Sequence, residues 1–167
     1  MFGKTNFSNI LVYNKFMYVG YYDSKVGLIQ MCADDTSLLS CLFIDKKELK
    51  ENKNEIINRA INQIDEYFKG NRFTFDLPLK LVGTDFQIKV WKELMKIPYG
   101  ETCSYFDIAY RINMPKACRA VGNANNKNKF VILIPCHRVI GKNNKMVGYA
   151  GGINKKEALL TLEALNC

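Results

Sequence analysis

The chain has 167 residues, of which 48% are hydrophobic and 24% are charged, a composition that is typical of a globular protein and excludes a disordered one. No segment approaches the roughly 18 apolar residues that span a bilayer, and the first ten residues lack the apolar core of a signal peptide. We therefore expect a soluble intracellular protein, cytoplasmic or, if its source is eukaryotic, nuclear, with one domain or two small ones.

The positive charge of the chain is concentrated in one segment. The formal net charge is +8, and residues 111–156 contain ten basic residues but no aspartate or glutamate. The rest of the chain carries 14 basic and 16 acidic side chains and is nearly balanced. The basic segment is either a solvated face or a surface for a polyanion such as nucleic acid, because clustered cations gain from counterion release.

The six cysteines are widely and irregularly spaced, and His137 is the only histidine. There is no Cys-x-x-Cys pair, and one histidine cannot complete a Cys2His2 site. We therefore expect no metal and no cofactor. Because no secretion signal is present, the cysteines should stay reduced.

The first half of the chain predicts antiparallel strands followed by one helix. Residues 9–33 are rich in β-branched and aromatic side chains interrupted by turn signals, and residues 41–44 suit another strand. Residues 54–69 repeat apolar side chains at helical spacing, with Gly70 as a stop signal. Residues 71–86 then have the character of an extended link between two halves.

The second half predicts more helix. Residues 87–97 place apolar side chains on one side of a helix, which Pro98-Tyr99-Gly100 breaks. Ser104 suits the N-cap of a second helix, with Asp107 in the third helical position. Pro115 suits the first turn of a third helix. Two helices joined by so tight a turn predict a helix-turn-helix.

The helix predicted over residues 115–126 has small side chains on one face. These small residues are Ala117, Ala120, Gly122 and Ala124. Such a face permits close packing against another helix in a core, which is one interpretation. Lys116, Arg119 and the neighbouring asparagines would be awkward in a core, so a helix that faces nucleic acid is the other.

The stretch Pro135-Cys136-His137-Arg138 places the only histidine directly after a cysteine. The thiolate is the reactive form of cysteine, and a histidine can take up the thiol proton. Neighbouring side chains in an extended chain point to opposite sides, so a bridging water is one route between the two. An inert buried thiol is the other interpretation, because a cysteine beside a histidine is a weak signal by itself.

A histidine that acts as a base also needs a group to orient it, usually a carboxylate. In the last predicted helix, Glu157 completes a capping box with Asn154, which gives this acid a structural role. Glu163 lies deeper, in an apolar segment where an acid needs a partner. We expect His137 to be that partner; a partly exposed acid at the helix edge is the alternative.

The run Pro135-Cys136-His137-Arg138-Val139 resembles the active-site signature of the O6-alkylguanine-DNA alkyltransferases, and the resemblance covers residues 84–165. Further matching stretches are residues 97–101, 104–105, 119–124, 128, 132–134, 148–152 and 160–163. The resemblance implies an α+β fold. Its parts would be an α/β-type ribonuclease-H-like domain with antiparallel strands over residues 1–80, and a mostly helical winged-helix, helix-turn-helix domain over residues 81–167.

The resemblance also implies an activity. The protein would flip O6-alkylguanine out of double-stranded DNA and transfer the alkyl group irreversibly and stoichiometrically to Cys136, with O4-alkylthymine as a minor substrate. Rotation of the nucleotide is needed because the target carbon is out of reach in a stacked duplex. The protein would bind DNA mainly through the minor groove, as a monomer and without a cofactor.

Residue roles carry over from the resemblance onto the matching positions. Cys136 would be the nucleophile, His137 would act on it through a water, and Glu163 would orient His137. Asn128 would hold the active-site segment, and Tyr105 would donate toward guanine N3. The implied DNA-binding residues are Lys116, Ala117, Arg119, Ala120 and Gly122, together with Tyr105. The implied substrate pocket is formed by Val131, Arg138, Val139, Tyr149, Ala150 and Gly151.

The sequence departs from the family pattern in places. Lys129 and Val131 stand where prolines are common, and Asn125 replaces a larger or apolar residue in the recognition helix. Two other functions stay open. One is a lesion sensor on the same scaffold, against which Cys136 argues; the other is an unrelated cysteine hydrolase, which leaves the basic, alanine-faced helix unexplained.

Overall fold

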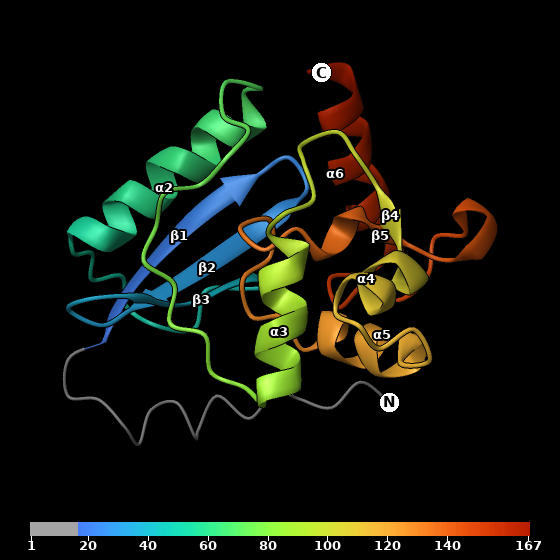
Figure 1. The fold of residues 1–167 in the computed structure, drawn as a ribbon. Helices are drawn as coiled ribbons and strands as arrows, with labels where there is room; N and C mark the ends of the chain where they lie inside the picture. Colours follow the sequence, from blue (N-terminus) through green and yellow to red (C-terminus); the bar gives the residue numbers. More distant parts are fainter. Residues whose placement is uncertain (1–16) are drawn as a thin grey trace.

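The computed structural model describes residues 17–167, so the strand expected near residue 10 lies outside the described residues. The described chain has an α+β fold, in which an antiparallel sheet with one helix precedes a mostly helical part (Figure 1). This architecture confirms the fold class that the sequence predicts. Between residues 17 and 167, no helix is both long and apolar enough to cross a membrane.

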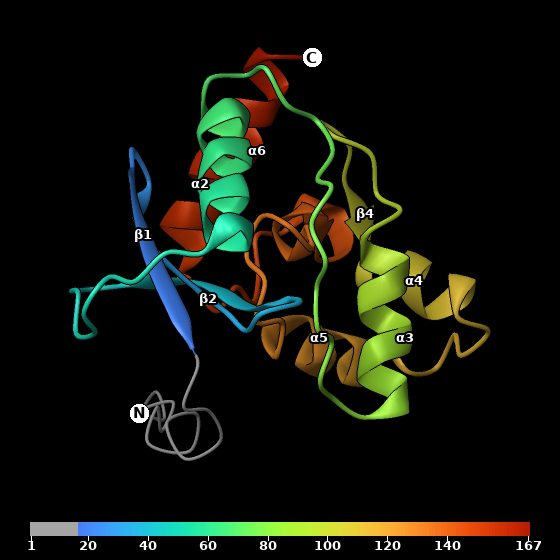
Figure 2. The same cartoon turned by 90° about the vertical axis from the view of Figure 1, so that its left-hand side faces the viewer.

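The N-terminal sheet has three antiparallel strands in chain order, of which β3 is an edge strand. These strands are β1 (Tyr18–Ser24), β2 (Gly27–Ala33) and β3 (Leu38–Ile44). The turn between β1 and β2 is closed by Ser24, whose side chain accepts from the Gly27 N–H at 3.1 Å. Helix α2 (Glu55–Phe68) packs against β1 and β2 (Figure 2).

Helix α2 begins and ends as its sequence predicts. The Asn54 side chain accepts a hydrogen bond from the Ile57 N–H at 3.0 Å and so caps the first turn. Gly70 follows the last turn with φ of 74°, a left-handed conformation that favours glycine. The apolar face of the helix includes Ile64 and Tyr67, which are fully buried.

Two later segments of the chain attach to the free edge of β3. The Leu38 N–H donates to the Pro78 carbonyl at 2.7 Å. Further along the strand, the Cys41 N–H donates to the Lys129 carbonyl at 2.8 Å, and the Val131 N–H donates to the Cys41 carbonyl at 2.9 Å. These bonds cover an edge that would otherwise be open. They also fix the segment that follows Val131 against the sheet.

The C-terminal part combines four α-helices with a two-stranded parallel sheet, and α4 and α5 form the predicted helix-turn-helix. Its elements are α3 (Asp85–Leu94), β4 (Cys103–Ser104), α4 (Tyr105–Arg111), α5 (Cys118–Asn126), the 3-10 turns η1 (Cys136–Arg138) and η2 (Lys142–Asn144), β5 (Val139–Ile140) and α6 (Ile153–Leu165). Ser104 caps α4 and exchanges hydrogen bonds with Asp107, as predicted.

Two helices of this part begin elsewhere than the sequence predicts. Helix α3 begins two residues early, because Thr84 and Gln87 form a reciprocal capping box. The expected start of α5 at Pro115 is wrong. Pro115 lies in a separate turn, in which the Ala117 N–H donates to the Met114 carbonyl at 2.8 Å, and the helix follows that turn.

The capping box expected from Asn154 and Glu157 is also wrong. Gly152, with φ of 93°, occupies the cap of α6 and accepts from the Lys156 N–H at 3.2 Å. Asn154 therefore lies inside the first turn, where its side chain makes no capping bond. Glu157 is exposed on the helix.

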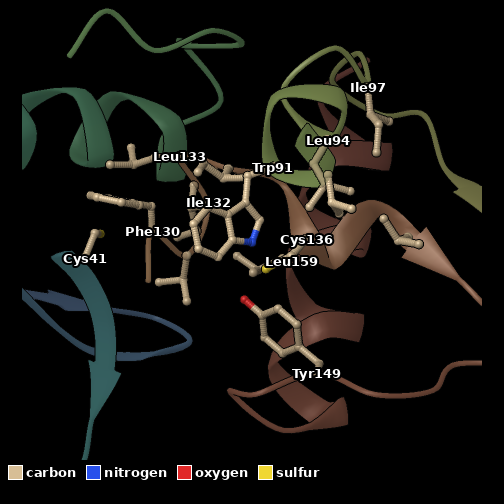
Figure 3. Packing of buried hydrophobic residues seen from close by; sticks show 14 of the residues in the cluster. Cys41, Trp91, Leu94, Ile97, Phe130, Ile132, Leu133, Cys136, Tyr149 and Leu159 are labelled. Atoms are coloured by element: carbon tan, nitrogen blue, oxygen red, sulfur yellow. The ribbon is translucent and has the colours of Figure 1, made fainter. Parts of the chain in front are cut away.

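The two parts share one hydrophobic core, part of which is drawn in Figure 3. Buried residues from both parts meet in it, among them Ile29, Met31, Ile64, Leu94, Ile134 and Leu159. The Trp91 Nε1 donates to the Ala124 carbonyl at 2.8 Å and ties α3 to α5. Because the core is continuous, side chains from the N-terminal part can reach groups in the C-terminal part.

Candidate active site and nucleic-acid interface

The segment between α5 and β5 is held in shape by Asn128. Its Nδ2 donates to the Ile134 carbonyl at 2.9 Å, and its Oδ1 accepts from the Phe130 N–H at 2.9 Å. These bonds supply partners to backbone groups that no helix or strand pairs. The same Nδ2 lies 3.0 Å from the Cys136 Sγ, so one amide both shapes the loop and contacts the sulfur.

The Cys136 thiol is buried, with only 3% of the residue exposed. Burial raises its pKa to about 11, because a thiolate loses its hydration there; the hydrogen bond from Asn128 and the positive charge of Lys156 oppose this rise. The thiol is therefore protonated at neutral pH in this structure. Its proton must be taken up by a neighbouring base when the sulfur reacts.

His137 and Glu163 lie together, as the sequence predicts. The His137 Nε2 is 2.6 Å from the Glu163 Oε1, and both side chains are fully buried. Burial lowers the pKa of His137 despite the carboxylate, so the imidazole is neutral at neutral pH. With the proton on Nε2 toward the carboxylate, Nδ1 carries the free lone pair. That Nδ1 is buried and has no partner in the protein.

Glu163 accepts hydrogen bonds from three further residues. The Tyr67 hydroxyl donates to Oε1 at 2.7 Å, and the Gly100 N–H donates to Oε2 at 3.1 Å. The Arg138 guanidinium donates to both oxygens, at 2.9 and 3.0 Å. Burial alone would raise the pKa of Glu163, but His137 and Arg138 outweigh it and lower the pKa to about 2. The carboxylate is therefore charged and fully satisfied.

Arg138, which the resemblance assigns to the substrate pocket, contacts Glu163 in this structure. Its guanidinium is buried and bonds Glu163, and its Nη1 donates to the Ile97 carbonyl at 2.7 Å. The sequence could not separate these roles, because Arg138 adjoins Cys136 in the chain. The 3-10 turn η1 directs their side chains apart: the sulfur meets Asn128, and the guanidinium meets Glu163.

Lys156 is a site residue that the sequence analysis missed. Its side chain is fully buried, and its Nζ donates to the Val139 carbonyl at 2.6 Å and to the Val147 carbonyl at 3.0 Å. Burial lowers its pKa. The lysine thus joins α6 to both ends of the loop that precedes Tyr149. The only sequence signal for its burial is its helical spacing from Leu159, because its chain neighbours Lys155 and Glu157 are charged.

The loop that ends at Tyr149 covers the cysteine. The Tyr105 hydroxyl donates to the Val147 carbonyl at 3.1 Å and so holds this loop to α4. Figure 3 shows the hydroxyl of Tyr149 pointing toward the Cys136 sulfur. This hydroxyl is buried without a partner. Of the other residues that the resemblance assigns to the pocket, Val131 and Val139 are buried, Ala150 is exposed and Gly151 is half-buried.

The two faces of α5 differ in burial. Lys116, Arg119 and Ala120 are exposed, and Ala117 and Gly122 are half-buried. Ala124 and Asn125 are buried instead. Asn125 therefore does not face outward: its Nδ2 donates to the Cys136 carbonyl at 3.3 Å, and its Oδ1 is buried without a partner. One face of the helix is therefore packed in the core, and the other face is exposed.

Comparisons with known proteins assign both parts of the chain to the same family. Residues 85–165 match the DNA binding domain, and residues 17–81 the ribonuclease-like domain, of 6-O-methylguanine DNA methyltransferase. The methylated-DNA–protein-cysteine methyltransferase of Methanosarcina acetivorans is 44% identical over 153 residues, which cover 88% of this chain and 98% of the relative. The Mycobacterium tuberculosis protein of that name is 57% identical over 104 residues, covering 62% of this chain and 63% of the relative.

Solved structures are similar as well. The crystal structure of Mycobacterium tuberculosis O6-methylguanine methyltransferase has a TM-score of 0.83 and 40% identity, covering 91% of this chain and 95% of that one. That organism's OGT in complex with DNA also has a TM-score of 0.83, at 41% identity, covering 90% and 94%. A Pyrococcus kodakaraensis methyltransferase, at 19% identity and a TM-score of 0.57, shares the fold.

Fold and site together define an α+β protein in which a helix-turn-helix adjoins a buried cysteine, histidine and glutamate. Because the family matches span residues 17–81 and 85–165, the chain belongs to the 6-O-methylguanine DNA methyltransferase family. It is a DNA-repair alkyltransferase, whose relatives are named for the transfer of methyl from DNA to a protein cysteine.

Proposed function

We propose that Cys136 is the acceptor of this transfer and O6-alkylguanine in double-stranded DNA is the donor. The observation that carries the proposal is that two contacts around one loop lie directly after a helix with an exposed cation. Asn128 lies 3.0 Å from the Cys136 sulfur, and the next residue, His137, bonds Glu163 at 2.6 Å. The loop follows directly on a helix that exposes Arg119.

The proton inventory supports His137 as the base. The Cys136 thiol starts protonated, and the neutral imidazole presents an unpaired Nδ1. A water between them would carry the thiol proton to Nδ1, while Glu163 stabilises the imidazolium that forms. Sulfur then attacks the alkyl carbon, a C–S bond forms, and the C–O bond to guanine breaks. The electron pair leaves on the guanine, which finally takes the proton.

The product is a thioether, which water does not readily hydrolyse. The transfer is therefore irreversible, and each protein molecule reacts once, at Cys136. The same attack is available to an alkyl group on thymine O4, which makes O4-alkylthymine a minor substrate. Besides the DNA substrate and one bridging water, these steps use only the chain's own side chains, and the proposed reaction uses no cofactor.

The DNA-facing surface is proposed to be α5 and its neighbours. The minor groove is only about 6 Å wide, so a helix with the small exposed Ala120 and half-buried Ala117 and Gly122 can approach its floor. Lys116 would contact a phosphate without reading sequence. Arg119 would fill the gap left by the flipped nucleotide, which offsets part of an unstacking cost of a few kcal/mol.

The substrate pocket is proposed to form when the covering loop moves. A purine cannot reach a cysteine that is 3% exposed, and the bond from Tyr105 to the Val147 carbonyl must break before Tyr105 can donate to the base. The Cys136 and Val139 carbonyls would then accept from the guanine amino group, and the Ala150 amide would face O6. Tyr149, Gly151 and Val131 would surround the alkyl group.

We propose further that the protein acts as a monomer, with residues 1–80 and 81–167 as its two domains. Cytoplasmic or nuclear placement follows from a DNA substrate. The shared core described above supports a functional unit that needs both domains, since side chains of α2 reach Glu163.

Peptide mass spectrometry after incubation with O6-methylguanine duplex tests the proposal. We expect one methyl on the Cys136 peptide, and none in a Cys136→Ala variant that still binds DNA. Unmodified protein after prolonged incubation would support a lesion sensor instead. Continued turnover of an ester or amide would support a cysteine hydrolase.

A further inference from the structure

We propose that Tyr67, on helix α2 of the N-terminal part, is a positioning residue for alkyl transfer. Its hydroxyl holds the Glu163 carboxylate so that the His137 imidazole stays neutral and keeps Nδ1 free. The inference rests on the proposed role of His137 as the base. It assigns the N-terminal part a function inside the active site, besides its contribution to the core.

The contact itself is short and enclosed. The Tyr67 hydroxyl lies 2.7 Å from the Glu163 Oε1, across 96 positions of the chain, and neither side chain is exposed. A hydrogen bond from a hydroxyl to a charged oxygen is stronger than a neutral one, and exclusion of water strengthens it further. The tyrosine ring is fixed by edge-on contacts with Phe68 and Tyr99, so the hydroxyl has little freedom to turn away.

Tyr67 and His137 share the same oxygen. Oε1 receives the Tyr67 hydroxyl at 2.7 Å and the His137 Nε2 at 2.6 Å, as well as one Arg138 nitrogen at 3.0 Å. Each donor withdraws negative charge from that oxygen, so each weakens its pull on the others. Without the tyrosine hydroxyl, Oε1 would attract the His137 proton more strongly and favour the imidazolium.

Other charged and titratable groups around the imidazole set the background. Arg138 and Lys156 disfavour its protonation through their positive charges, and Glu163 favours it. Cys136 and Tyr99 also lie in this environment, uncharged at neutral pH. Tyr67 acts on this balance without carrying a charge. Its removal should therefore shift the balance toward a protonated histidine, which cannot accept the thiol proton.

The test combines a spectroscopic and a kinetic readout on the full chain. Because His137 is the only histidine, its ring nitrogens give unambiguous NMR signals that report both tautomer and titration. In Tyr67→Phe we expect the His137 titration, and the acid limb of the single-turnover methyl-transfer rate, to move upward together by about 0.5 pH unit. Below that limb the rate should fall about threefold, and at high pH it should return to the wild-type value.

Tyr22→Phe is the matched control. The Tyr22 hydroxyl also donates to a carboxylate of α2, Asp65 at 3.0 Å, which does not hydrogen-bond Glu163 or His137. The Tyr22→Phe variant should leave the His137 titration and the pH dependence of the transfer rate unchanged. If Tyr67→Phe does not fold, 3,5-difluorotyrosine at position 67, a stronger donor, should move both profiles downward.

The outcomes separate two failures. Wild-type protein that never acquires methyl on Cys136 would refute the proposed function. Wild-type protein that does so, with His137 titrating alike in the wild type and Tyr67→Phe, would overturn the role of Tyr67 alone. A lower melting temperature without a shift of the pH profiles would give the tyrosine a purely structural role, which also contradicts the inference.

Discussion

The Asn128 amide nitrogen lies 3.0 Å from the Cys136 sulfur and, at the same time, 2.9 Å from the Ile134 carbonyl oxygen. One side chain therefore shapes the loop that carries the nucleophile and stabilises the negative charge that the nucleophile must develop. Structure and reactivity should respond together when this amide is removed.

Replacing Asn128 by alanine should lower the free energy of unfolding by about 1–3 kcal/mol, because it leaves the Phe130 N–H unpaired and leaves the Ile134 carbonyl with the Cys136 N–H as its donor. It should also raise the pKa of Cys136 above about 11, since the amide is a hydrogen bond to the thiolate. Urea unfolding and the pH dependence of haloacetamide labelling measure the two effects. Asn126→Ala, at an exposed position of α5, is the control and should change neither.

Glu163 should make stability depend on pH in the acid range. Its folded pKa of about 2 lies below its ordinary value of 4.5, so its contribution is fully present above pH 4.5 and is lost as pH falls through about 2. The loss amounts to about 3 kcal/mol. Thermal unfolding from pH 6 down to pH 2 should show a decline that is smaller in Glu163→Gln than in the wild type, because the lowered pKa values of other carboxyls such as Asp34 still contribute. Glu157→Gln, at an exposed site of the same helix, should retain the full decline. Parallel curves for Glu163→Gln and wild type would contradict this assignment.

Lys156→Met should destabilise the loop before Tyr149. The substitution removes the lysine donor from the buried Val139 carbonyl, at a cost of about 1–3 kcal/mol, and leaves the Val147 carbonyl with the Tyr105 hydroxyl as its donor. We expect faster amide hydrogen exchange in residues 139–149 and faster labelling of Cys136 by a small thiol reagent. Lys155→Met changes the neighbouring lysine, which is not fully buried, and should label at the wild-type rate. Equal labelling in both variants would count against the loop role of Lys156.

Arg119→Ala should impair repair of paired lesions much more than reaction with a free base. If this exposed side chain fills the gap in the duplex, its loss should slow transfer from duplex DNA about tenfold or more. The rate with free O6-benzylguanine should stay within about twofold, because no base has to be flipped. Lys127→Ala, an exposed cation beyond the end of α5, serves as the charge control. A proportional loss on both substrates would contradict a flipping role.

Local sequence signals predicted the parts of the fold that local interactions decide. Ser104 with Asp107, and Asn54 before α2, are caps whose partners lie three residues away. The cap expected at Asn154 was wrong: Gly152, with a positive φ, occupies the cap of α6, and Asn154 lies inside the first turn. The residue at which α6 begins depends on the conformation of the loop before the helix, and a capping motif contains no information about that loop.

The contacts of the candidate site also divide into those that neighbouring residues decide and those that the tertiary fold decides. Cys136 and His137 are neighbours in the chain, and the burial of Glu163 follows from its apolar surroundings, so their association could be predicted. Tyr67 could not, because helical periodicity predicts that its ring is buried but not that its hydroxyl meets an acid 96 positions away. The contact of Arg138 with Glu163 could not be predicted either, because the 3-10 turn that directs its side chain has no clear sequence signal.

The central claim is that Cys136 captures one alkyl group for each protein molecule and keeps it. Intact and peptide mass spectrometry, with O6-methylguanine duplex in increasing excess over protein, measures this most directly. We predict that methylation saturates at one methyl per chain, on Cys136, with one lesion consumed. Consumption of lesion beyond one equivalent, or a methyl on any other residue, would contradict the account.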